Sequence, residues 1–214
     1  MVCIMSNTVG HSAHEDPIRL APDEDRLYRI AEPREGYFTT SDAAAAGYSR
    51  SLLSHHVASG MLERVDHGVY RLSRFPESSH ADLIVAWLRA GESSAISHER
   101  ALGLYGLSDI LPHEVHVTVP RTASRRRHGP RLHTSELGKD DVAEFEGVRI
   151  TTVERTITDV ARAGLADELI VQAIDEALQR GLTPPRRGLR GQRRRAVAEQ
   201  GVSSSGHLIG VTQA

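Results

Sequence analysis

The sequence has little that would hold it together through covalent or metal chemistry. Its 214 residues include a single cysteine, Cys3, which excludes a disulfide scaffold and a cysteine-rich zinc site. No apolar run approaches the ~20 residues of a membrane span, so we expect no integral membrane segment. The N-terminus has no basic region followed by a long apolar stretch, so we expect no secretory signal and predict a cytoplasmic protein.

Aromatic residues and lysine are also scarce. Aromatics make up 4% of the chain, so a core must consist mainly of Leu, Val, Ile and Ala. Lys139 is the only lysine, whereas five arginines fall in 121–131 and six in 186–195, with no acid in either segment. In a chain with a net charge of -2, such local clusters indicate contact with phosphates or an acidic partner, or else a solvated loop or tail.

The apolar periodicity divides the chain into four segments. We predict a disordered leader over 1–21, a winged-helix domain over 22–75, an α+β domain over 80–182 and a disordered arginine-rich tail over 183–214. The two ends lack a regular apolar pattern and are rich in polar residues, which is typical of disorder. Pro76 lies in the linker between the two folded segments.

The segment 22–75 has the order of a winged helix-turn-helix. After a first helix and a short extended piece at 37–39, Thr40 and Ser41 can cap a second helix. Gly47 supplies a tight turn, and Ser49 can cap a third helix that ends near Gly60. Two short strands joined by a glycine-containing turn follow and predict a wing.

The segment 80–182 mixes helices with strands. Helical spacing predicts helices over 80–90, 97–105, 152–163 and 166–180. Alternation predicts a strand over 115–119 with His116 and Thr118 on a solvated face, and strands over 132–135, 142–145 and 148–151. Helices and strands are segregated along the chain, so we predict an α+β domain with a small antiparallel sheet.

The third helix and the wing carry the candidate DNA-binding residues. The N-terminal residues of a recognition helix contact base edges in the major groove, and an arginine there can hold a guanine with two hydrogen bonds. Arginines on a wing suit phosphate or minor-groove contact. The candidates are Thr40, Ser41, Ser49, Arg50, Ser51, Ser54, His55, Arg64, His67 and Arg71. The ordinary alternative is a solvated helix and a charged edge strand.

A second basic segment is a candidate contact with the DNA backbone or with a partner, and its residues are Arg121, Arg125, Arg126 and Arg127. We predict no catalytic residue, because Ser97, His98 and Glu99 are consecutive and their side chains diverge on a helix. We predict no metal site and no cofactor. A carboxylate cluster of the nuclease type on the last two predicted helices is the enzymatic alternative.

Blocks of the sequence resemble the AbiEi family of antitoxins. The winged-helix blocks are GYFTTSDA at 36–43, GYSR at 47–50, GMLERV at 60–65 and GVYRL at 68–72. Further blocks at 96–102, 115–120 and 151–159 resemble the C-terminal region of that family, so the resemblance spans about 24–182.

The resemblance implies a bacterial type IV antitoxin that also represses its own promoter. It implies a winged helix that binds double-stranded DNA at inverted repeats. Because the winged-helix segment is not strongly basic, we expect DNA binding to need a homodimer or additional arginines. It also implies a second domain that counters a nucleotidyltransferase-like toxin, and no catalytic residue. Two alternatives stay open: a winged-helix regulator without a toxin partner, and a regulatory or remnant half of an endonuclease-like enzyme.

Overall fold

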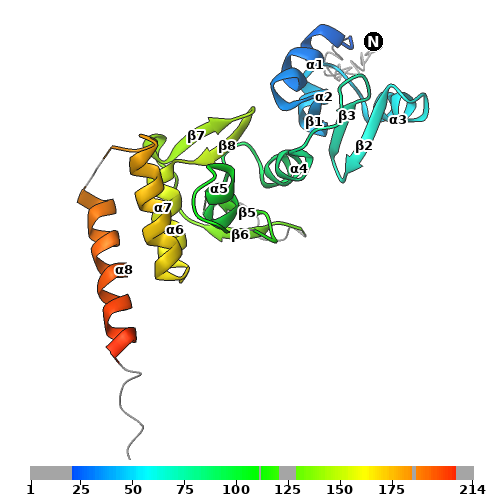
Figure 1. Cartoon of the computed structure of the whole chain (residues 1–214). Helices are drawn as coiled ribbons and strands as arrows, with labels where there is room; N and C mark the ends of the chain where they lie inside the picture. Colours follow the sequence, from blue (N-terminus) through cyan, green and yellow to red (C-terminus); the bar gives the residue numbers. More distant parts are fainter. Residues whose placement is uncertain (1–20, 111, 121–128, 185–186, 206–214) are drawn as a thin grey trace, which may run out of the picture.

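The computed structural model describes residues 21–110, 112–120, 129–184 and 187–205 and contains two sheets. Figure 1 shows them in two lobes, with α4 between the lobes. The predicted leader therefore lies almost wholly outside the described residues, as do 206–214 and the candidates Arg121, Arg125, Arg126 and Arg127.

The N-terminal lobe is a three-helix unit with a small antiparallel sheet in the order β1-β3-β2. Its elements are α1 (Glu24–Ala31), a 3₁₀ turn (Glu32–Arg34), β1 (Tyr37–Thr39), α2 (Thr40–Ala45), α3 (Arg50–Ala58), β2 (Leu62–Asp66) and β3 (Val69–Leu72). One face of the sheet packs against the helices around Phe38, Leu53 and Leu62, which are almost completely buried. The predicted order of helices and hairpin is confirmed.

The second lobe is built on a five-stranded sheet in the order β6-β5-β4-β8-β7. Its strands are β4 (Ala95–Ile96), β5 (His116–Val119), β6 (Arg131–Thr134), β7 (Val142–Phe145) and β8 (Val148–Thr151). Its helices are α4 (Ala81–Ala90), α5 (His98–Leu104), a 3₁₀ turn (Lys139–Asp141), α6 (Val153–Arg162), α7 (Asp167–Gln179) and α8 (Arg187–Ser205). One apolar cluster joins α4 to the sheet, and another joins α5, α6, α7 and α8.

The predicted α+β class is confirmed, and the second sheet is more complex than predicted. The β7–β8 and β4–β5 pairs are antiparallel, whereas β4 pairs with β8 and β5 with β6 in parallel. Strand β5 therefore lies inside the sheet, and all four of its residues are buried. The prediction that His116 and Thr118 face solvent is wrong, because a central strand covered on both faces has no solvated side.

The prediction of disorder from residue 183 onward is wrong for the part described, because α8 forms there. Leu189 and Ala196 are each 3% exposed and belong to the apolar cluster with α6 and α7. Arg193 forms a two-pronged contact with Asp175 of α7 at 2.7 and 2.9 Å. The apolar positions are sparse among arginines, and tertiary packing supplies what the local pattern does not show.

The two lobes share part of one core through α4. Tyr37 and Val69 of the N-terminal sheet belong to the same apolar cluster as Trp87 of α4 and the second sheet. Ion pairs reinforce this contact: Arg89 Nη1 lies 2.7 Å from Asp66 Oδ2, and Arg34 Nη2 lies 2.7 Å from Glu92 Oε1. The lobes therefore do not present two separate cores, which makes the isolated N-terminal lobe expose apolar surface that the full chain buries.

Candidate nucleic-acid interface and a histidine cluster

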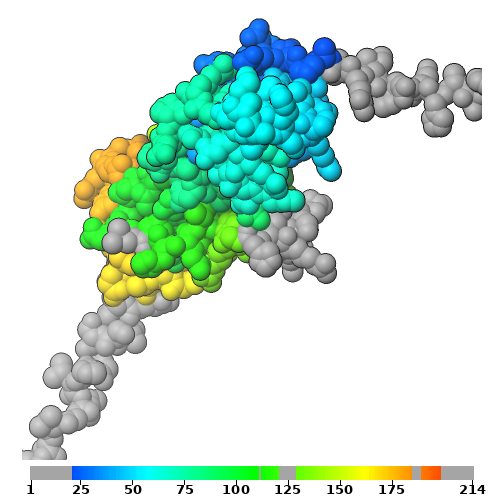
Figure 2. Space-filling model, turned by 90° about the vertical axis from the view of Figure 1, so that its right-hand side faces the viewer, coloured from blue at the N-terminus to red at the C-terminus, as the bar shows by residue number. Residues whose placement is uncertain are grey.

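The third helix, α3, presents a polar outer surface beside the hairpin. Ser49 is the N-cap, as predicted, and its Oγ accepts from the backbone N–H of Leu52 at 3.2 Å. Leu53 anchors the inner side of the helix at 1% exposure. Arg50, Ser51, Ser54 and His55 are all exposed, and in Figure 2 the cyan segment that contains them forms an open face of the molecule.

The hairpin tip and the first turn of α2 lie together. The N-cap of α2 is Thr39 rather than the predicted Thr40 or Ser41, because Thr39 and Asp42 form a reciprocal capping box. Thr40 is thereby free to bind the hairpin, and its N–H and Oγ1 both donate to Gly68 O, at 2.9 and 3.3 Å. This places Thr40 and Ser41 next to the tip residue His67, which is exposed.

The two hairpin arginines point to opposite faces of the sheet. Arg64 pairs with Tyr70, two positions after Leu62, and so lies on the α3 side, where it is exposed. Arg71 pairs with Glu63 and Tyr37 on the other face. Its guanidinium contacts Glu63 Oε2 at 2.8 Å and donates to Phe75 O and Pro76 O.

Arg71 is therefore less available to DNA than the other candidate residues. Its side chain is only 12% exposed, and the bonds to Phe75 and Pro76 fix the linker that leaves the wing. The reason is that successive side chains on a strand point to opposite faces of the sheet. Arg64 is paired with Tyr70, the residue next to Arg71, so the two arginines lie on opposite faces. The remaining nine candidates on α2, α3 and the hairpin lie at the surface or partly exposed.

Three of the carboxylates of α6 and α7 that carried the enzymatic alternative are engaged by other groups. Asp175 is paired with Arg193, and Glu176 accepts from the Ser108 N–H at 2.9 Å and from Gln172 at 2.9 Å. Asp159 is 7% exposed at its side chain and is paired with Arg155. These contacts are those of structural carboxylates, so the geometry gives no support to a nuclease-type cluster on these helices.

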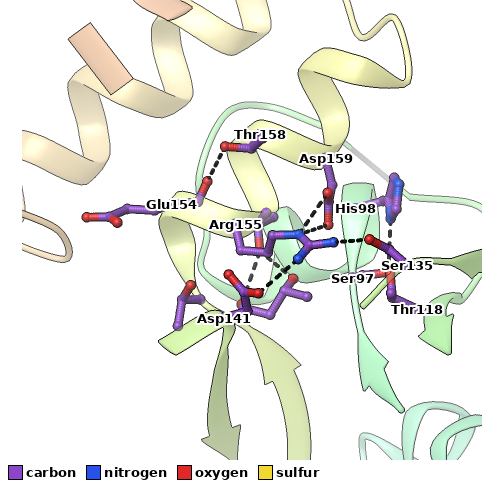
Figure 3. A network of polar contacts seen from close by, with 12 residues as sticks. Ser97, His98, Thr118, Ser135, Asp141, Glu154, Arg155, Thr158 and Asp159 are labelled. Carbon is purple, nitrogen blue, oxygen red and sulfur yellow. Dashed lines mark hydrogen bonds and ion pairs between the residues drawn. The ribbon is translucent and has the colours of Figure 1, made fainter. Parts of the chain in front are cut away.

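Arg155 is the centre of a polar network in the second lobe (Figure 3). Its Nε donates to both oxygens of Asp159 at 2.9 Å, and its Nη2 donates to Ser135 Oγ at 2.8 Å. Its Nη1 donates to Glu136 O at 3.0 Å and to Asp141 Oδ2 at 3.1 Å. One guanidinium thus ties α6 to the chain that follows β6.

Three histidines meet beside this network, and the sequence reasoning missed them. His98 begins α5, His116 begins β5, and His133 lies on β6. One ring nitrogen from each lies within 4.8 Å of the others, and this is the only such group of metal-ligand side chains found among the described residues. The rings of His98 and His133 are stacked with centroids 3.5 Å apart, and those of His116 and His133 are 5.2 Å apart.

Burial sets the protonation of this cluster. Desolvation, followed by the repulsion of the neighbouring histidines, lowers the pKa of His98 to about 3. Desolvation also lowers the pKa of His133 to about 4 and lowers the pKa of His116. The three imidazoles are therefore neutral near pH 7, and each has a ring nitrogen with a free lone pair.

The cluster is not satisfied by hydrogen bonds within the described residues. His98 Nδ1 lies 2.9 Å from Ser97 Oγ, which also accepts from Thr118 Oγ1 at 2.8 Å. Ser97 is at the N-cap position of α5, but its hydroxyl makes no capping hydrogen bond to the helix and takes part in these contacts instead. His116 Nδ1 and His133 Nε2 are buried and have no partner among the described residues, at a cost of about 1–3 kcal/mol each.

The sequence holds only a weak signal for this cluster. The three histidines are separated by 18 and 17 residues, which is not a metal-ligand spacing of a recognised motif. They converge because β5 and β6 pair in parallel with Thr118 opposite His133. His116 lies two residues before Thr118, so its side chain is on the same face of the sheet as that of His133. His98 also has a backbone φ of 54°, a conformation that non-glycine residues seldom adopt and that often occurs at functional sites.

Comparison with known families finds a match in the N-terminal lobe. Residues 25–73 match the family model described as a transcriptional regulator, AbiEi antitoxin. The resemblance predicted from the sequence is thereby confirmed for this segment, which includes α2, α3 and the hairpin. No curated protein matches the chain.

Among solved structures, the chain is similar to that of the RV2827C protein from Mycobacterium tuberculosis, with 15% identity and a TM-score of 0.46. The alignment covers 83% of this chain and 76% of the other. In the part of the chain that the structure describes, none of the helices has the length and apolar character needed to cross a membrane.

Proposed function

We propose that the chain is a DNA-binding transcriptional regulator that acts as the antitoxin of a bacterial type IV toxin–antitoxin system and represses its own promoter. The observation that carries the proposal is the match of residues 25–73 to the AbiEi antitoxin regulators, over a segment that folds as a winged helix with α3 exposed. It acts in the cytoplasm, where its promoter and a nucleotidyltransferase-like toxin are both within reach, and it is not an enzyme.

In this proposal α3 enters the major groove of double-stranded DNA. Arg50 lies in its first turn and is the residue best placed to hold a guanine edge, with Ser49, Ser51, Ser54 and His55 around it. Arg64 and the tip around His67 lie against the phosphates, beside Thr40 and Ser41. Helix α3 has only nine residues and few cations around it, so one copy makes few contacts with DNA. Two copies of the chain on an inverted repeat therefore supply the specificity for the operator.

The test of DNA binding is a gel-shift titration of the full chain against its own promoter region. Arg50→Ala is expected to weaken specific binding by about 1–3 kcal/mol and to relax the base preference at one position in each half-site. Arg190→Ala, an exposed arginine on α8 at the far end of the molecule, is the matched control and leaves binding unchanged. Equal weakening by both substitutions would mean that only the overall charge matters.

The antitoxin role needs its own experiment. Cells that express a nucleotidyltransferase-like toxin of this system are expected to recover growth when the full chain is co-expressed. The Arg50→Ala variant should rescue equally well, because toxin neutralisation is assigned to the second lobe and not to α3. DNA binding without rescue would leave a winged-helix regulator that has no toxin partner.

A further inference from the structure

We propose that His98, His116 and His133 form a binding site for a zinc ion in the second lobe, a site independent of the proposed DNA contact. The three residues come from α5, β5 and β6, and one ring nitrogen of each lies within 4.8 Å of the others. Three imidazoles are a ligand set that zinc adopts readily, with a fourth position left for water or another ligand.

The unpartnered nitrogens are the strongest argument for an ion. His116 Nδ1 and His133 Nε2 are fully buried without a hydrogen-bond partner among the described residues. Buried polar atoms are nearly always satisfied, so two such atoms in one cluster call for a ligand that accepts lone pairs. A zinc ion does so, whereas a hydrogen-bond acceptor does not.

The surroundings also suit a metal ligand at His98. Ser97 Oγ has two lone pairs, so it can accept from Thr118 Oγ1 and from the Nδ1–H of His98 at the same time. In the tautomer with the proton on Nδ1, this arrangement leaves the lone pair of His98 Nε2 free for a metal ion. Outer hydrogen bonds of this kind orient metal-binding histidines and increase their basicity.

Next to the cluster lies a pocket of about 450 Å³, lined by His98 and His133 together with Ser135, Asp159 and Arg162. It gives the fourth zinc position access to solvent. The carboxylate of Asp159 is held by Arg155, so it does not complete the ligand set in this arrangement. We therefore assign the fourth position to water.

The test uses the purified full chain after treatment with EDTA. Zinc chloride is titrated in a calorimeter, and cobalt chloride is titrated while the visible spectrum is recorded. We expect one zinc per chain with a Kd below about 10 μM, and a tetrahedral cobalt spectrum. At 100 times the Kd, the melting temperature should rise by about 5–10 °C.

His133→Leu separates the site from a merely structural role. It removes one unpartnered buried nitrogen, so the metal-free variant should be at least as stable as the native chain, while zinc binding is lost. His133→Cys keeps a zinc ligand and should restore binding. Ser97→Ala should weaken binding by ~10–100-fold, the effect of losing an outer hydrogen bond.

His67→Ala, at the exposed hairpin tip, is the control for binding by surface histidines, of which the chain has several among its twelve. It should bind zinc as the native chain does. The assignment is overturned if the native chain binds no zinc in this range, or if His133→Leu binds zinc with the native affinity and stoichiometry. It is also overturned if His67→Ala abolishes binding.

Discussion

Replacing Arg155 by methionine should destabilise the second lobe strongly at neutral pH. The substitution keeps most of the apolar stem and removes the guanidinium, which makes five hydrogen bonds to four residues. The main cost is the carboxylate of Asp159, which stays buried at 7% exposure without its cation. Breaking a buried ion pair on one side costs about 3–5 kcal/mol.

For a chain of this length, that loss corresponds to a fall in melting temperature of about 6–20 °C, at about 2–4 °C per kcal/mol. Urea unfolding of the full chain, followed by circular dichroism, measures the free energy directly. The double variant that also carries Asp159→Asn removes the stranded charge. It should therefore be more stable than Arg155→Met alone, a non-additive result that identifies the buried charge as the cause.

The destabilisation should also shrink in acid. Burial raises the pKa of Asp159 even beside Arg155, and loss of the guanidinium removes an interaction that lowers it. A carboxyl whose pKa is higher in the folded state than in the unfolded state gains stability as pH falls through its folded pKa. The deficit of Arg155→Met should thus be largest near pH 7 and smaller near pH 5. A deficit below about 1 kcal/mol at pH 7, or one independent of pH, would refute the reasoning.

Three further experiments test other parts of the structure. Gly147→Ala should cost more than Gly164→Ala in urea unfolding. Both glycines have a positive φ, which costs alanine about 1–2 kcal/mol, but only at Gly147 would a Cβ clash with a backbone oxygen of the other lobe, that of Pro33. Leu189→Ala should cost about 2–3 kcal/mol, and no loss would mean that α8 is not packed on α7. In gel shifts at several salt concentrations, Arg64→Ala should lower the salt slope by about one unit, whereas Arg71→Ala should leave it unchanged and reduce stability by about 1–3 kcal/mol.

The N-terminal lobe could be predicted from sequence because its signals are local. Ser49 caps α3, and Gly68 has the positive φ that the hairpin requires, and both effects act within a few residues. The exception is Arg71. The burial of its side chain depends on which face of the sheet meets the rest of the molecule. Tyr37 and Val69, which pack in the same cluster as α4, decide which face that is. No local pattern in 37–72 distinguishes the two faces.

The histidine cluster depends on pairing over long distances in the sequence. The alternation of Val115, Val117 and Val119 with His116 and Thr118 is typical of a strand with one solvated face, and it led to the wrong prediction for His116. Alternation shows that the two faces differ in polarity, and it does not show that the polar face meets water. Here that face lies against α5 and is shared by His133 of the neighbouring strand β6, so the polar side chains are buried against each other.

The buried histidine-rich face of the second lobe has a cost in stability that a ligand would offset. A buried face that contains unpartnered imidazole nitrogens is less stable than an apolar one of the same shape, and leucine at His133 would remove the penalty without creating a cavity. Val117 and Val119 supply the apolar face of β5, and the three imidazoles occupy its other face, with the rings of His98 and His133 stacked. A cluster whose unpartnered nitrogens cost stability is explained by a ligand, and the neutral imidazoles of His98, His116 and His133 fit a metal ion.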